Sequence, residues 1–302
     1  MYIPEQCEFK DLREYNIPGM IGLYKGVTPL EHKDNKIKTL KDDKPIPITF
    51  YQLFQRFKNQ DTDGSIFKFH RSFVVFRGAT GIGNPARWNP HSESFTWKSM
   101  AGTEVLHVDG KPILCYIMGF AVKSSICSPL VVNSGKSVKT ITIHPLKHEF
   151  ERMVSGFAQL HGKTTHLGCY ESGVNIVTRQ AELLDTTECA TFPKAESNTS
   201  QKDDGELGDI VGEAYDSPVS PRKASTRVIK EPNEHIPVYD LSNRGFRPES
   251  DFHRVAEKYH EITEGEVTTK MPIIVTFYVS RYHWKDEDNI ALNLQWIGQL
   301  AK

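Results

Sequence analysis

Cysteine is scarce in this chain, and the few cysteines are scattered. No two of them form a C-x-x-C pair, and their number is odd. This pattern argues against both a disulfide framework and a cysteine-rich zinc site. We therefore expect mostly buried thiols in a reducing compartment. The residues are Cys7, Cys115, Cys127, Cys169 and Cys189.

Long hydrophobic runs are also missing. The longest apolar stretches, Pro112 to Val122 and Pro272 to Val279, are well short of the roughly 20 residues that a membrane-spanning helix needs. The segment Met1 to Asp11 lacks the basic end and the apolar run of a secretion signal. The sequence therefore predicts an intracellular protein, cytoplasmic or nuclear, with no membrane partner.

Neither sign of charge dominates the composition. The 302 residues carry a formal net charge of -1, and the mean hydropathy is -0.46, both ordinary for a globular protein. The overall charge does not attract a polyanion, so a nucleic-acid site would have to be a local basic patch.

Nucleotide-binding loops are present only in part. Gly78, Gly81 and Gly83 follow a hydrophobic run, as in a dinucleotide-binding loop, but Pro85 and Pro90 prevent the helix that such a loop requires. The stretch from Asn133 to Ser137 has the end of a phosphate-binding loop without its first glycine. We expect turns at both places and no nucleotide cofactor.

Metal-dependent and nucleophilic chemistry have equally little support. His144 and His148 are spaced for one helical turn, but Pro145 is expected to start that helix and leave His144 outside it. No G-x-S-x-G motif occurs, and Cys169 near His166 has no recognisable orienting partner. We therefore expect no cofactor and no metal, and an enzyme with an unrecognised site is one alternative.

What the chain does contain is a segment from Ile66 to Lys98 in which aromatic and basic residues alternate with almost no acid. Aromatic faces can stack on bases while cations contact phosphates, as in a groove for single-stranded nucleic acid. A buried strand followed by a basic loop would have the same composition. Stacking is assigned to Phe69, Phe76, Trp88 and Trp97. Phosphate contact is assigned to Lys68, Arg71, Arg77, Arg87 and Lys98.

Three of these residues are the preferred candidates. The stretch Gly78 to Pro90 holds too many glycines and prolines for regular structure and is expected to be a long loop. Loops are usually exposed, so we expect Arg77, Arg87 and Trp88 to be accessible to a ligand.

Periodicity and capping signals predict the secondary structure around this segment. Thr49 and Gln52 form a capping box for a helix over Thr49 to Asn59. Apolar residues at helical spacing predict a second helix from Leu146 to Leu160 and a third after Ser250. Strands are expected over Ile66–Phe76, Thr103–Val108, Ile113–Val122, Val138–Ile143 and Val174–Leu184, with a terminal hairpin of Ile273–Trp284 and Ile290–Leu300. The pair Asp109-Gly110 predicts a tight hairpin turn.

Composition divides the chain into three parts. We expect a main β-rich domain over residues 1–184, a disordered acidic insert rich in Ser and Pro over 185–237, and a helix with a β-hairpin over 238–302 that completes the same domain. Ser217 and Ser220 each precede a proline in the insert and are candidate phosphorylation sites.

These observations favour a mostly β protein with a few helices. The expected fold is a partly open antiparallel barrel of the OB type, or else a sandwich of the jelly-roll type. The expected function is non-enzymatic binding of single-stranded nucleic acid. The second alternative is a self-assembling structural protein, for example a coat or scaffold subunit whose aromatic loops contact other copies in a homo-oligomer.

Overall fold

The structure is a computed structural model that describes most of the chain after residue 46. The predicted modification sites Ser217 and Ser220 lie outside the described residues, as does most of the predicted insert. Among the residues that are described, no helix is both long and apolar enough to cross a membrane. The described ranges are 47–57, 59–61, 63–90, 95–100, 103–132, 135–161, 166–170, 173–181, 228–263, 265–284 and 287–301.

Strands dominate the described residues, which confirms the predicted β-rich class with a few helices. The helical segments are α1 (Phe50–Phe57), α2 (Ser65–Val75), η3 (Pro85–Arg87), α3 (Lys147–His161), α4 (Pro248–Asp251), η4 (Phe252–Arg254) and α5 (Val255–Lys258). The strands are β1 (Gly78–Ala79), β2 (Ile82–Gly83), β3 (Phe95–Met100), β4 (Thr103–Val108), β5 (Lys111–Pro112), β6 (Leu114–Val131), β7 (Ser137–Pro145), β8 (His166–Leu167), β9 (Cys169–Tyr170), β10 (Gly173–Val177), β11 (Val238–Asp240), β12 (Pro272–Trp284) and β13 (Glu287–Gln299).

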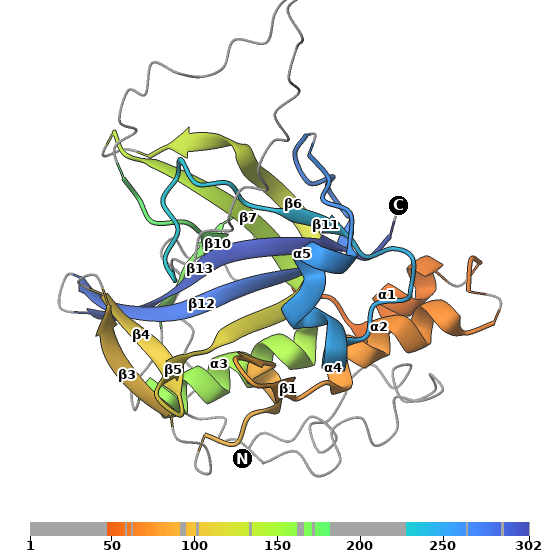
Figure 1. The fold of residues 1–302 in the computed structure, drawn as a ribbon, viewed down its shortest axis with the longest axis horizontal. Coiled ribbons are helices and arrows are strands. Elements are labelled where there is room, and N and C mark those ends of the chain that lie inside the picture. Colours follow the sequence, from red (N-terminus) through yellow and green to blue (C-terminus); the bar gives the residue numbers. More distant parts are fainter. Residues whose placement is uncertain are drawn as a thin grey trace, which may run out of the picture.

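Five of these strands close into a barrel (Figure 1). β6 pairs with β7, β7 with β10 and β13 with β12, all antiparallel. β10 and β13 are parallel, and β12 returns to pair antiparallel with β6, which closes the ring. Around the barrel, the strands therefore follow the order β6, β7, β10, β13 and β12. A closed five-stranded barrel is an OB-like architecture, so this predicted fold is confirmed and the sandwich is not adopted.

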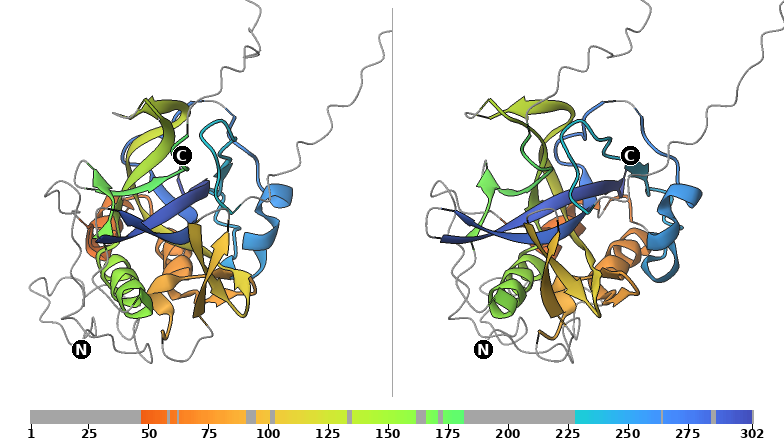
Figure 2. Two further views of the ribbon diagram at one scale, coloured as in Figure 1. Left: turned by 90° about the vertical axis from the view of Figure 1, so that its left-hand side faces the viewer. Right: turned by 60° about the vertical axis from the view of Figure 1, so that its left-hand side comes forward.

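Two small sheet extensions lie beside the barrel. The hairpin of β1 and β2 adds to the start of β6, where Ile82 pairs with Leu114 in parallel. The hairpin of β3 and β4 adds to β12, where Val105 pairs with Ser280. Figure 2 shows α3 running beneath the barrel strands, with the β3–β4 hairpin beside it. These two extensions form the walls of the candidate site.

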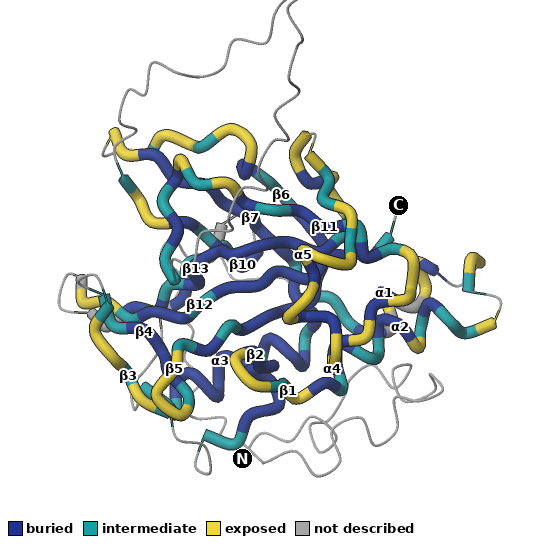
Figure 3. Tube along the Cα trace, in the orientation of Figure 1, coloured by how far each residue is buried: buried dark blue, intermediate teal, exposed yellow. Residues whose placement is uncertain are grey.

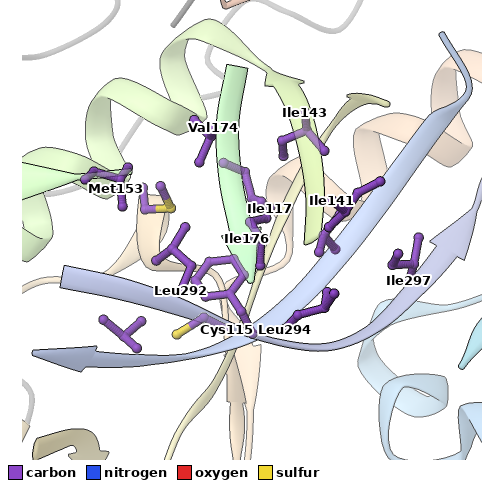
Figure 4. Close-up of a cluster of buried hydrophobic side chains, with 14 of the residues drawn as sticks. Cys115, Ile117, Ile141, Ile143, Met153, Val174, Ile176, Leu292, Leu294 and Ile297 are labelled. Atoms are coloured by element: carbon purple, nitrogen blue, oxygen red, sulfur yellow. The ribbon is translucent and has the colours of Figure 1, made fainter. Parts of the chain in front are cut away.

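The barrel interior is filled with side chains. Alternate residues of the barrel strands point inward and meet apolar side chains of α3 in one cluster (Figure 4). Because small barrels are packed in this way, a ligand site is expected outside the barrel rather than within it. The side chains labelled in Figure 4 are Cys115, Ile117, Ile141, Ile143, Met153, Val174, Ile176, Leu292, Leu294 and Ile297.

A second core covers the outer face of β6 and β12. Tyr116, Met118 and Phe120 of β6 point outward and pack against α1, α2 and the segment that contains α4 and η4. The hydroxyl of Tyr116 donates to the backbone oxygen of Phe73, at 2.6 Å. β6 is therefore buried on both faces, which explains why its first half is a continuous apolar run. Figure 3 shows these buried strands in contrast with exposed residues in β1, β3 and β5.

The predicted strand Ile66–Phe76 is wrong, because these residues form the helix α2. Its buried residues, Ile66, Phe69, His70, Phe73 and Val74, recur at helical spacing. Asp61 accepts hydrogen bonds from the backbone N–H groups of Ile66 and Phe67, both at 2.8 Å, and so satisfies donors that a first helical turn leaves open. Helical periodicity and capping outweigh the β-branched and aromatic composition here.

Several local predictions are confirmed. The capping box at α1 forms as expected, since Gln52 N–H donates to Thr49 Oγ1 at 3.1 Å and Thr49 N–H to Gln52 Oε1 at 2.7 Å. Asp109 and Gly110 have φ values of 50° and 79°, as a tight hairpin turn requires. α3 and the terminal hairpin of β12 and β13 also lie where the sequence predicts them.

Two parts of the second half of the chain differ from expectation. The helix predicted after Ser250 is divided into α4, η4 and α5. Residues 228–237, assigned to the insert by composition, pack against the barrel: Gln295 Nε2 donates to the backbone oxygen of Val228 at 2.9 Å, and Lys139 Nζ to that of Glu234 at 2.8 Å. The packed structure therefore resumes about ten residues earlier than predicted.

Candidate functional site

The candidate site is an open cleft between the bend from Arg77 to Asn89 and the turn from Val108 to Ile113. It has a volume of about 760 Å³, which is the size of a site for a small ligand or a short polymer segment. Phe95 of β3 contributes to the same wall as the turn. We refer to it below as the loop cleft.

Two glycines allow the backbone of the bend to fold closely. Gly78 has a φ of 141°, and a Cβ there would lie 2.6 Å from the backbone oxygen of Ile82. A Cβ at Gly83 would lie 2.7 Å from the indole nitrogen of Trp88. The glycines of the bend therefore allow the Trp88 ring to pack closely against its backbone.

Hydrogen bonds from α3 hold the next part of the bend. The Glu149 carboxylate accepts hydrogen bonds from Arg87 Nη2 and Asn84 Nδ2, each at 3.0 Å. Arg152 Nε donates to the backbone oxygen of Ala86 at 2.6 Å. The segment from Asn84 to Arg87 is thus fixed against the helix that packs on the barrel.

The expected exposure of Arg87 and Trp88 is wrong. Both line the loop cleft, but Arg87 is only 7% exposed and Trp88 only 6%. The Arg87 guanidinium is directed to Glu149, and the Trp88 ring packs on Phe95 with 4.9 Å between ring centroids. The breaker-rich composition predicted an exposed loop without regular structure, but this segment contains β1, β2 and η3, and tertiary contacts bury Arg87 and Trp88.

The accessible charges of the loop cleft are Arg77, Lys111 and Asp109, all of which are exposed. Lys98 is exposed on the neighbouring strand β3, and its Nζ donates to the backbone oxygen of Gly110 at 3.5 Å. This hydrogen bond places a further ammonium group next to the turn. Among the described residues, cations thus outnumber the acid at the rim, which favours an anionic ligand.

Trp97 lies on the same strand but outside the loop cleft. Its indole nitrogen donates to the backbone oxygen of Leu160 at 3.4 Å, and the Arg281 guanidinium lies 4.8 Å from its ring centroid. Arg281 is in turn paired with Glu104, with 2.6 Å between Nε and Oε2. These contacts connect β3 to α3 and β12.

The remaining predicted binding residues lie on or next to α2 and do not line the loop cleft. Phe69 and Phe76 are buried in the second core, where Phe76 stacks on Phe252 with 5.6 Å between centroids. Lys68 is exposed and Arg71 is half-buried on the helix. None of these four residues lines the cleft that contains Arg77.

Sequence reasoning missed three residues of the loop cleft. Phe95 belongs to the aromatic and basic segment but is not among the predicted binding residues. The sequence assigns Asp109 only to a hairpin turn and gives no role to Lys111. Their signal was indirect: a charged turn joined to strands that follow the basic segment closely. Lys111 and Arg77 line the same cleft because β2 pairs with the start of β6 and β5 pairs with β4.

The described residues contain no cluster of three or more His, Cys, Asp or Glu side chains able to hold a metal ion. His144 lies on β7, whose last residue is Pro145, and His148 lies on α3, so the helix begins at Lys147 and not at Pro145 as predicted. No family model matches the chain, and neither a curated protein nor a solved structure matches it. The function of the loop cleft therefore has to be argued from its geometry.

Proposed function

We propose that this protein binds single-stranded nucleic acid in the loop cleft and does not catalyse a reaction. The observation that carries the proposal is the placement of exposed Arg77 and Lys111 beside the half-buried Phe95 in one open cleft. Cations for phosphates next to an aromatic face for bases are the two features that single-strand binders combine.

The residue roles differ from those assigned from sequence. Arg77 and Lys111 contact phosphates, and Lys98 adds positive charge beside the turn. Phe95 is the stacking face, because only 6% of Trp88 is exposed and its ring mainly supports Phe95. Arg87 holds the wall through Glu149 and makes no phosphate contact in this proposal.

The shape of the site supports a single strand over a duplex. A volume of about 760 Å³ between two loops suits a few unstacked nucleotides. Bases can reach an aromatic face only when they are not paired and stacked in a duplex. OB-like barrels often bind oligonucleotides or oligosaccharides, and this analogy adds support at the level of fold alone. A nucleic-acid ligand would place the protein in the cytoplasm or the nucleus.

Of the described residues, Arg77 and Lys111 are the two exposed cations that line the loop cleft. We expect Arg77→Ala/Lys111→Ala to bind a labelled single-stranded 20-mer much more weakly than wild type does. Each lost phosphate contact should also reduce the slope of log K against log salt by about 0.7. Fluorescence anisotropy between 50 and 200 mM salt measures both quantities.

The control variant Arg247→Ala/Arg254→Ala removes the same charge from exposed residues at α4 and η4 and should retain wild-type binding. Phe95→Leu separates stacking from charge and should weaken binding by about 1–3 kcal/mol with an unchanged salt slope. Equal losses in both double variants would contradict the proposal.

Light scattering without oligonucleotide tests the alternative, since homo-oligomers would support a self-assembling structural protein.

A further inference from the structure

Asp109 is an acidic residue in a cleft whose other charged lining residues, among those that the structure describes, are Arg77, Arg87 and Lys111. It is exposed, and its backbone is fixed by the hairpin turn at a φ of 50°. Within the described part of the chain, its carboxylate makes no hydrogen bond and no ion pair. Asp109 lines the loop cleft without such contacts, so its carboxylate is available to a ligand that enters the cleft.

This carboxylate opposes the binding of phosphate, so it needs another role if the site binds nucleic acid. The turn itself does not require the charge, because Asn-Gly satisfies the same hairpin geometry as Asp-Gly. A carboxylate is an acceptor with two oxygens and pairs best with a group that presents two parallel donors.

Guanine is the base that presents such a pair. In a single strand its Watson–Crick edge is open, and N1–H and the N2 amino group point in the same direction. Adenine and cytosine present one amino donor beside a ring acceptor, and thymine or uracil presents one N–H between two carbonyl oxygens. Those acceptors repel a carboxylate, so the geometry favours guanine.

We infer that Asp109 selects guanine: its carboxylate accepts hydrogen bonds from N1–H and N2–H of a guanine base that rests on Phe95. Arg77 and Lys111 hold the phosphates on either side of that nucleotide. The inference rests on the proposed function, since it assigns a base preference to the same loop cleft.

The test compares four labelled nine-mers, T9 and the three sequences in which the central thymine is replaced by G, A or C. A single guanine avoids four-stranded structures. Wild type should bind the guanine-containing strand roughly tenfold more tightly than the other three, the size of one good bidentate contact. Asp109→Asn, which keeps the turn, should bind all four with similar affinity.

Asp63→Asn is the matched control, because Asp63 is exposed at the start of α2 and does not line the loop cleft. This variant should retain the guanine preference. Equal affinity of the wild type for all four strands would overturn the guanine assignment and leave the proposed function standing. The same holds if Asp109→Asn keeps the preference. If the wild type binds none of the four strands, the proposed function itself is overturned.

Discussion

His70 is a buried titratable residue on α2, with only 2% of its surface exposed. Its ring stacks on Phe57 with 5.2 Å between centroids, and its Nδ1 lies 2.8 Å from the backbone oxygen of Ile66. Burial lowers the pKa of His70 from 6.5 to about 4, although the contact with Ile66 opposes the shift. His70 is therefore neutral in the folded protein at neutral pH.

This pKa predicts a loss of stability in acid. Between pH 6.5 and about 4 the unfolded chain binds a proton at His70 that the folded protein does not bind. The free energy of unfolding should therefore decrease as the pH falls through this window, by on the order of 3 kcal/mol in total. His70→Phe keeps an aromatic ring against Phe57 and should remove this part of the pH dependence.

Urea unfolding at a series of pH values measures the effect. His253→Gln changes an exposed histidine and should leave the wild-type profile intact. An unchanged slope in His70→Phe would show that His70 is not the group responsible.

The sequence identifies several residues of the loop cleft, but it does not predict reliably which of them are exposed. Arg77 is exposed, as predicted for a loop, and Lys98 is exposed on β3, a strand that the sequence analysis did not predict. The burial of Arg87 depends on Glu149, which lies 62 residues later in the chain. No local pattern reveals a partner at that distance, so the exposure of Arg87 could not be predicted.

The contact of η3 with α3 holds one wall of the loop cleft. Glu149 is 5% exposed and holds both Arg87 and Asn84. Removing one partner of a buried ion pair is costly, because the other charge loses its compensation in a poorly solvated place. The wall of the cleft therefore depends on a side chain that does not line it.

We expect Glu149→Gln to lower the free energy of unfolding by roughly 3 kcal/mol, since it removes the charge but keeps the shape of the side chain. Chemical denaturation measures this change. Glu151→Gln, two positions along the same helix, alters a more exposed carboxylate that pairs with His148 and should cost less than 1 kcal/mol, as surface pairs do. Similar losses in the two variants would contradict a special role for Glu149.

Elements with a clear period or cap were predictable, and α2 shows where that approach fails. Its residues have the composition of a strand, which dominated the prediction. The same segment contains two helix signals. Ile66, Phe69 and Phe73 recur at helical spacing, and the acidic residue Asp61 precedes them. For short aromatic segments, periodicity and caps are better guides than β propensity.

At the scale of the whole molecule, the β-rich class and the hairpins were predictable, but the strand order was not. Hairpins join neighbours in sequence, and β12 with β13 illustrates this. Closure of the barrel instead needs β6 to pair with β12, and β10 with β13, across long stretches of chain. Pairings between distant strands are not specified by local signals.

The way the ring closes has a consequence for fragment complementation. One stretch of chain supplies β6, β7 and β10, and a later stretch supplies β12 and β13. Neither stretch alone can close the barrel. A polypeptide cut between Ala181 and Val228 should yield two pieces that aggregate separately, because each presents unpaired strand edges. Co-expressed, the pieces should copurify and unfold together, whereas a soluble, independently folded first piece would contradict this.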